Sequence, residues 1–499
     1  MHFLFLKMLS KVIHLMIKDK SLKKNAFFNV LKTLMGILFP LITFPYTSRI
    51  LLPDGLGKVN FANSIISYFT MIASLGIAGY GIREAAKKRK NKQELSQFFI
   101  EIFTINIIST IISYILLFLA IQFIPKFSEY RILLLILSIS ILFSTIGVDW
   151  MLGALEEYGF VAIRSFLIQL LCLILLFLFV KSKEDYYKYA MIIVFSSVGS
   201  NIFNLFHLRK FISFNQIKKL QLRQHLKPIF IFFGSSIAVS IFTMLDTTML
   251  GMLSDDTQVG YYSASIKVVH LIRNLFPAIF TVMFAQMSIM VNENNQDRLR
   301  ELINKTLCLI MCLSFPIISG LFILARPVIF LLAGTNYMSA VSTMYTMIPL
   351  IFFSSISSFL GGNVLNSQGK EKTYLCCVII GAVSDFVLNF LLIPKHGSLG
   401  AGIATITTEI IIFILYIFIN KKFVFSKQNF ISFAKYLSAT LVMTICCIFT
   451  SKLFYSEIFK LIFTTILGII VYFIMLLLFK DSILSNFISI IKVKLKINK

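Results

Sequence analysis

The feature that most constrains this chain is a succession of apolar runs, each roughly long enough for one membrane-spanning helix, between residues 27 and 479. Hydrophobic residues make up 58% of the sequence and charged residues only 14%. Ordinary soluble domains contain about 25% charged residues, so the composition excludes that class. We therefore expect an all-α integral membrane protein.

Pro, Gly and clusters of charge divide these runs into fourteen candidate transmembrane helices. An even number of spans places both termini on the same side of the membrane. The candidate helices are residues 27–47, 59–82, 98–123, 131–152, 159–180, 187–207, 228–252, 260–290, 304–325, 340–364, 373–393, 400–420, 431–451 and 457–479.

The basic residues predict the orientation of these spans. If the N-terminus is cytoplasmic, the inner segments contain 31 of the 47 Lys and Arg residues. Cytoplasmic loops are enriched in Lys and Arg, so we expect a multi-pass membrane protein with both termini cytoplasmic. Most of the net charge of +25 is then a topology signal, including the run Lys87-Lys88-Arg89-Lys90.

Both ends are expected to lie on the cytoplasmic surface. Lys7, Lys11, His14 and Lys18 share one helical face, so residues 1–24 are predicted to form an amphipathic cytoplasmic arm. A start of translation at Met16 is the alternative. Residues 481–499 form a basic cytoplasmic tail.

Polar stripes occur in two pairs of predicted spans, the first with the second and the seventh with the eighth, about 200 residues apart. This spacing predicts two six-helix lobes in a parallel pseudo-repeat. Transporters built in this way bind substrate between their lobes. The predicted parts are an N-lobe at 25–207, a basic cytoplasmic linker at 208–227, a C-lobe at 228–424 and two C-terminal helices at 425–480.

Ionisable residues inside the spans are candidates for function, because each costs about 2.5–3.5 kcal/mol at the bilayer centre. Snorkelling towards the interface offers another explanation for Arg164. Asp246 can alternatively form an internal ion pair. The basic candidates are Lys32, Arg49, Arg83, Arg164, Lys267 and Arg273, and the acidic ones are Asp149, Asp246, Asp385 and Glu409.

Polar residues at helical spacing accompany these cations and are expected to line a cavity, although small and polar residues also allow helices to pack closely. A cationic, hydroxyl-compatible cavity in an apolar protein favours the export of an amphiphilic anion. The polar candidates are Asn29, Asn60, Asn63, His270 and Asn274.

Other chemistries find little support. The sequence has no G-x-x-x-x-G-K-[ST] loop for nucleotide hydrolysis. Its seven Cys residues lie in apolar runs, and its His residues are not at metal-ligand spacing. We therefore expect a transporter rather than an enzyme, with no metal, no cofactor and no nucleic-acid partner.

Several segments resemble one family. They are FPYTSRILLPDGLG at 44–57, GIAGYGIRE at 76–84, Leu245-Asp246-Thr247, VGYY at 259–262 with Lys267, and Asn389 followed by IPKHGSLGA at 393–401. This pattern is similar to bacterial polysaccharide repeat-unit flippases (Wzx-type), in the polysaccharide transporter family of the multidrug/oligosaccharidyl-lipid/polysaccharide exporter superfamily. The resemblance covers about residues 25–420. Leu52 departs from it, because the family usually has Gly there.

The resemblance implies a fourteen-helix fold that moves undecaprenyl-diphosphate-linked oligosaccharide from the inner to the outer leaflet of the bacterial plasma (inner) membrane by alternating access. The product can be capsule, exopolysaccharide or O-antigen. Arg49, Arg83 and Lys267 lie in matching motifs of a cationic cavity, to which periodicity adds Lys32 and Arg273. Asp246 is the candidate for coupling to an H⁺ or Na⁺ gradient. A polysaccharide polymerase and glycosyltransferases are candidate partners.

Three alternatives remain open at this point. A peptidoglycan-precursor (lipid II) flippase would share the helices and the basic cavity. A drug or cation antiporter of the same superfamily would typically have twelve spans and rely on buried carboxylates. A membrane polysaccharide polymerase, which is an enzyme, would carry a larger external loop.

Overall fold

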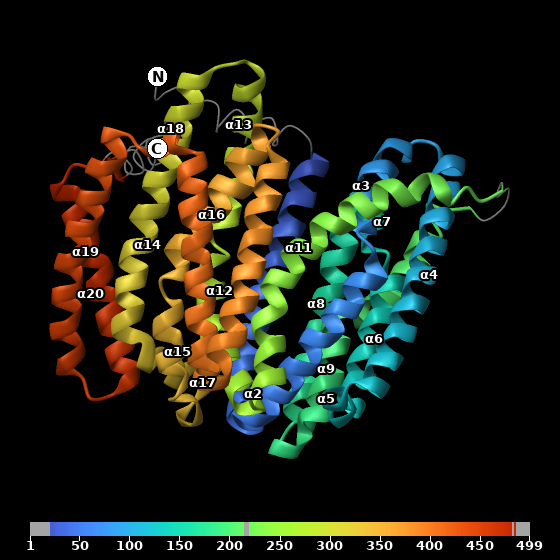
Figure 1. Ribbon diagram of the computed structural model, residues 1–499, viewed down its shortest axis with the longest axis horizontal. Coiled ribbons are helices and arrows are strands. Elements are labelled where there is room, and N and C mark those ends of the chain that lie inside the picture. Colours follow the sequence, from blue (N-terminus) through green and yellow to red (C-terminus); the bar gives the residue numbers. More distant parts are fainter. Residues whose placement is uncertain (1–19, 214–218, 482–483, 486–499) are drawn as a thin grey trace. The chain divides into compact units, whose positions relative to one another are not determined.

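The computed structural model (Figure 1) describes residues 20–213, 219–481 and 484–485. Within these ranges, side chains are described except at 20–38, 235–236, 238–242, 278 and 281–282. Every element in this part of the chain is a helix, which confirms the all-α fold. The predicted arm up to residue 19 and the tail from residue 486 lie outside the described residues.

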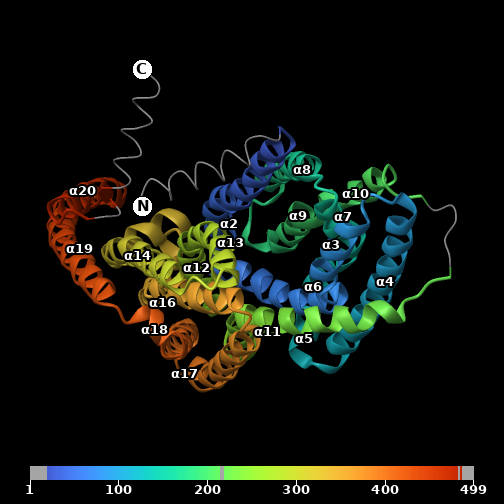
Figure 2. The same cartoon turned by 90° about the horizontal axis from the view of Figure 1, so that it is seen from above.

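The chain forms two compact units, Met1–Met244 and Leu245–Lys499, and the boundary falls inside α11. In the first unit, α3 packs against α4 and α7 (Figure 2). Its helices are α2 Lys20–Ser74, α3 Ile77–Lys88, α4 Lys92–Phe123, α5 Pro125–Glu129, α6 Arg131–Gly147, α7 Asp149–Ala154, α8 Tyr158–Phe179, η1 Lys183–Asp185, α9 Tyr186–Val198, η2 Gly199–Asn201, α10 Ile202–Leu208 and α11 Arg223–Leu253.

The second unit contains the end of α11 and all later helices. The last two long helices, α19 and α20, pack on each other and on α14 (Figures 1 and 2). The helices are α12 Asp256–Arg273, α13 Phe276–Asn292, α14 Gln296–Ala333, η3 Thr335–Tyr337, α15 Ala340–Met347, α16 Leu350–Ser357, η4 Ser358–Leu365 (a π-helix), α17 Glu371–Ile419, α18 Lys421–Val424, α19 Lys427–Leu453 and α20 Glu457–Leu478.

Each unit has its own apolar core. The core of the first unit includes Phe98, Phe99 and Trp150, together with Ile229 from α11. The core of the second includes Tyr436 and Tyr472. Many large apolar side chains on the long helices are exposed instead, as expected for surfaces in contact with lipid.

Among the described residues, ten helical stretches are long and apolar enough to span a membrane. Two of them, Phe39–Lys88 with 50 residues and Glu371–Ile419 with 49, are far longer than one crossing needs. At 1.5 Å per residue each would measure about 75 Å, against about 30 Å of hydrocarbon. Each therefore holds two of the predicted spans, while the total of fourteen stays a prediction.

Backbone kinks separate the two crossings within these stretches. Leu52 interrupts α2 with φ 60°, and Gly397 interrupts α17 with φ 54°. Positive φ favours Gly, which explains the glycine in the IPKHGSLGA segment. It also explains why the family usually has Gly at the position of Leu52, since a Leu side chain is strained in this conformation.

The alternative explanation of Arg164 by snorkelling is wrong. Its side chain is buried, and its guanidinium donates to Asp149 Oδ1 at 2.5 Å, Ser200 Oγ at 2.6 Å and Asn201 Oδ1 at 3.0 Å. These contacts join α8, α7 and η2, so Arg164 has a structural role inside the first unit.

Candidate functional site

The second unit contains a buried group of oxygen-bearing side chains around two carboxylates, which we call the carboxylate cluster. Three helices contribute to it, α11, α12 and α17. Asp246 is 5% exposed and Asp385 is fully buried. The cluster consists of Asp246, Tyr262, Asp385, Asn389, Thr405 and Thr408.

Asp246 is held on both of its carboxylate oxygens. Oδ2 accepts hydrogen bonds from Tyr262 Oη at 2.5 Å and Thr405 Oγ1 at 2.9 Å. Oδ1 accepts one from Asn389 Nδ2 at 2.6 Å. Asn389 Nδ2 also donates to Asp385 Oδ2 at 3.1 Å, so one amide bridges the two carboxylates.

Neutral donors alone hold these two acids in the part of the chain that the structure describes. None of the ion pairs found there includes Asp246 or Asp385. Two buried carboxylates side by side repel one another unless a proton or a cation neutralises them. An oxygen-rich cluster of this kind can therefore bind a proton or a hard cation.

Asn389 Oδ1 supports this interpretation. It is buried and accepts no hydrogen bond from any described residue, although its amide nitrogen is fully engaged with both carboxylates. A buried acceptor without a donor is costly, and a bound cation would remove that cost. The residues present therefore fit a small cation, with Asp246, Asp385, Asn389 and Thr405 as its candidate oxygen ligands.

The second region of interest is the GIAGYGIRE segment at 76–84 in the first unit. Gly76 begins α3 with φ 70°, and a Cβ at this position would meet the backbone of Phe232 and Phe233. A Cβ on Gly81 would lie 2.5 Å from the Trp150 ring. Glycine is needed at these positions because two neighbouring segments lie directly on the α3 backbone.

Arg83 lies on α3 at the end of this segment, with 54% of its side chain exposed. Its guanidinium carbon is 5.3 Å from the ring centroid of Phe232 and 5.9 Å from that of Tyr80. Arg83 Nε donates to Glu84 Oε1 at 3.1 Å. The cation is thus accessible yet held on several sides, an arrangement suited to binding an anion.

The other predicted cations lie on three helices. Arg49 is exposed on α2 and donates to Pro45 O at 2.6 Å. Lys267, His270 and Arg273 follow one another by three residues along α12 and are half-buried. Arg273 interacts electrostatically with the buried Glu409 of α17.

The remaining polar candidates differ in exposure. Asn60 is half-buried and Asn63 exposed on α2, while Asn274 is the exposed C-cap of α12. Lys32 and Asn29 fall in the stretch of α2 whose side chains lie outside the description. A single cavity that brings the two units' cations together stays a prediction.

Sequence reasoning singled out Asp246 and noted Asp385 and Asn389, but it missed Thr405 and Thr408. The spacing of these residues along the sequence did contain a signal for the cluster. Asp385 and Asn389 are four residues apart, and Thr405 and Thr408 are three apart on the next span, so each pair shares a helical face. What the spacing could not show is that both faces meet Asp246.

Comparison with known proteins decides the family. The family model described as "Polysaccharide biosynthesis protein" matches residues 22–291, and the MatE model matches residues 232–391. The chain belongs to the polysaccharide biosynthesis protein family. The resemblance to Wzx-type flippases of the multidrug/oligosaccharidyl-lipid/polysaccharide exporter superfamily is thereby confirmed.

One curated relative is a candidate O-antigen transporter of Escherichia coli (strain K12), 24% identical over 402 residues, which cover 79% of this chain and 95% of the relative. Among solved structures, lipid II flippase MurJ aligns with 92% of this chain and 100% of its own, with a TM-score of 0.75 and 17% identity. The alignment with a multidrug resistance MATE family transporter covers 77% of this chain and 93% of the transporter, with a TM-score of 0.62 and 14% identity. The prediction of a membrane transporter rather than an enzyme is confirmed.

Proposed function

We propose that this protein translocates lipid-diphosphate-linked oligosaccharide repeat units from the inner to the outer leaflet of the bacterial plasma membrane, with both termini cytoplasmic. The observation that carries the proposal is the family match over residues 22–291, because this region contains Arg49, Arg83 and Lys267. The name of the Escherichia coli relative, an O-antigen transporter candidate, agrees with this cargo.

Three kinds of surface would bind the three parts of the cargo, which are the diphosphate, the sugars and the lipid tail. An arginine can bind the diphosphate with two parallel hydrogen bonds, and the exposed guanidinium of Arg83 is the best placed to do so. Polar residues such as Asn63 would contact sugar hydroxyls. The polyprenyl tail would stay against the exposed apolar side chains of the helices.

The transport cycle would alternate between the two faces of the membrane. The head group enters from the cytoplasm, the inner side closes, and the outer side opens to release it. Glycosyltransferases on the inner face would supply the repeat units, and a polysaccharide polymerase on the outer face would consume them for capsule, exopolysaccharide or O-antigen.

We further propose that the carboxylate cluster couples this cycle to an H⁺ or Na⁺ gradient. Asp246 and Asp385 would bind the ion between them, and Asn389 Oδ1 would become a third ligand when the amide group, whose nitrogen now bridges the two carboxylates, turns over. One charge crossing 100 mV releases about 2.3 kcal/mol, enough to bias the exchange between two conformations. Binding of the ion would remove the repulsion between the carboxylates and favour one of those conformations.

The proposal is tested in a strain that lacks the gene and is complemented with Arg83→Ala or Lys267→Ala. We expect surface polysaccharide to be lost and lipid-linked single repeat units to accumulate in the inner leaflet, at normal protein level and topology. Lys305→Ala is the matched control, because Lys305 is a surface lysine paired with Glu301. Full polysaccharide output from both cavity variants would contradict the proposal.

The same deletion separates the rival functions. Loss of a lipid II flippase would cause lysis, and loss of a drug antiporter would cause drug sensitivity without any change in lipid-linked sugars. Composition analysis of the accumulated repeat unit would identify the sugar and the product polymer.

A further inference from the structure

The first half of α11 lies on α3 along a single face. His225, Ile229 and Phe232 follow one another by four and three residues, which places them on the same side of the helix. His225 and Ile229 are buried, whereas Phe230, between these positions, is 54% exposed. All these residues belong to the first unit.

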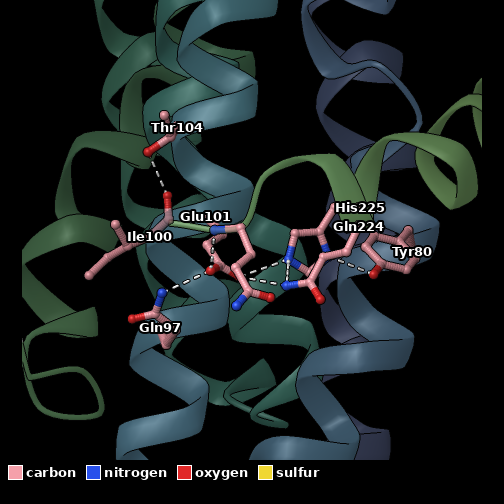
Figure 3. A network of polar contacts seen from close by, with 8 residues as sticks. Tyr80, Gln97, Ile100, Glu101, Thr104, Gln224 and His225 are labelled. Carbon is pink, nitrogen blue, oxygen red and sulfur yellow. Dashed lines mark hydrogen bonds and ion pairs between the residues drawn. The ribbon is translucent and has the colours of Figure 1, made fainter. Parts of the chain in front are cut away.

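A buried polar network fixes the beginning of this face (Figure 3). His225 Nε2 lies 2.8 Å from Glu101 Oε2 on α4, and His225 Nδ1 lies 2.8 Å from Tyr80 Oη on α3. Glu101 Oε1 also accepts from Gln97 Nε2 at 2.8 Å and from the backbone nitrogen of Gln221 at 2.9 Å. A fully bonded buried network of this kind holds α11 in one register on α3 and α4.

One turn further along, a glycine of α3 allows a close contact between α3 and α11. A Cβ on Gly79 would lie 2.8 Å from Cδ1 of Phe232, closer than any side chain tolerates. The Phe232 ring therefore rests on the bare backbone of α3. Gly79 and Arg83 are four residues apart and share a face of α3, so the ring lies beside the guanidinium.

The ring and the cation are within interaction distance. The guanidinium carbon of Arg83 is 5.3 Å from the Phe232 centroid, inside the range of about 6 Å for cation–π attraction. Tyr80, anchored by His225, contributes the second ring at 5.9 Å. A long and exposed arginine would otherwise sample many rotamers, and each contact reduces that freedom.

We propose that Phe232 is a positioning residue, which holds the Arg83 guanidinium in the orientation that binds the diphosphate of the cargo. This inference rests on the role of Arg83 in the proposed function. According to this inference, the support for the Arg83 cation has three parts: the glycines of the GIAGYGIRE segment, the His225 network and Phe232.

The test uses the full-length protein in proteoliposomes and measures flipping of polyprenyl-diphosphate-linked N-acetylglucosamine over a range of lipid concentrations. Phe232→Leu removes the ring and keeps an apolar side chain, whereas Phe232→Tyr keeps the ring. Phe230→Leu is the matched control on the exposed side of α11. Protein amount and thermal stability are measured for every variant.

We expect Phe232→Leu to raise the half-saturating lipid concentration about fivefold, the size of one partly exposed cation–π contact, with little change in the maximal rate. Phe232→Tyr and Phe230→Leu should match the wild type. In the double variant, Phe232→Leu should add nothing to the loss measured as residual proteoliposome flipping in Arg83→Ala, because residues that act through one another are not additive.

A wild-type half-saturating concentration for Phe232→Leu, or an independent further loss on top of Arg83→Ala, would overturn the positioning role. Unchanged transport by Arg83→Ala alone would instead overturn the proposed function of the cation itself. The two failures are therefore distinguishable.

Discussion

The Arg83 region of the first unit and the carboxylate cluster of the second use charge in opposite ways. Arg83 is half-exposed and is held by two aromatic rings and Glu84. Asp246 and Asp385 are buried and held only by neutral donors among the described residues. An accessible cation suits a large anionic cargo, whereas a closed carboxylate pair admits only a small ion. In the proposed function, this difference in burial would assign cargo binding to Arg83 and ion coupling to the carboxylate cluster.

The comparison also predicts how each site responds to conservative changes. A buried carboxylate cannot be replaced without altering the charge of a closed site, so even an isosteric amide should be severe. An exposed cation is surrounded by water, so part of its function should survive replacement by another cation.

The largest expected effect is that of Asp246→Asn, which keeps the shape and removes the charge. We expect gradient-driven flipping in proteoliposomes to fall at least tenfold, because a single carboxylate remains to bind the ion. Asp297→Asn, an exposed acid in the first turn of α14, is the control. If an imposed Na⁺ or H⁺ gradient still accelerates flipping normally in the Asp246 variant, the carboxylate cluster does not couple flipping to the gradient.

Arg83→Lys should have the next largest effect and tests the cargo side of the comparison. Lysine keeps the charge but loses the planar fork that matches a diphosphate, so we expect about a tenfold loss of flipping at low lipid concentration. Arg89→Lys, at the C-cap of α3 and paired with Glu156, should change little. If Arg83→Lys behaves as wild type, a point charge is sufficient and bidentate binding is refuted.

Tyr262→Phe should weaken the cluster moderately. It removes the 2.5 Å hydrogen bond to Asp246 Oδ2 while leaving the acid in place. Asn389 and Thr405 still hold the acid, so we expect the loss to match an ordinary hydrogen bond of about 0.5–1.5 kcal/mol, which is roughly a twofold to tenfold shift in the ion concentration that gives half-maximal flipping. Tyr261→Phe, at the neighbouring half-buried tyrosine, is the control. An equal shift in that variant would show that the effect does not depend on the hydrogen bond from Tyr262 to Asp246.

The smallest effect on transport is expected from changes at the two His–Glu pairs. Because these pairs differ in burial, they test how burial changes the contribution of a pair to stability. His225→Gln breaks a pair in which both side chains are about 5% exposed, whereas His207→Gln breaks one that is partly exposed. We expect the first to lower thermal stability in detergent by several degrees and the second by less, because only the buried Glu101 loses its partner in a dry site. Equal losses would show that burial does not distinguish the two pairs.

The sequence predicted the helical class, the approximate spans and Asp246, because these depend on composition, length and the cost of a charge in lipid. It predicted two spans in α2 but left residues 48–58 between them, because Leu52, where the helix kinks, is not a glycine that would mark the break. Periodicity gives the face on which a residue lies but not the helix that covers that face. For this reason the partners of Arg164 and of Asp246 emerged only from the structure.

Trp150, which a Cβ on Gly81 would touch, is the only tryptophan in the sequence. Its ring is buried between α3 and α4, within 6.2 Å of the Phe98 and Phe99 centroids. The protein therefore carries one tryptophan fluorophore, packed against the middle of the helix that bears Arg83. The emission of the unlabelled wild type should report directly whether that helix loosens when cargo or ion is added.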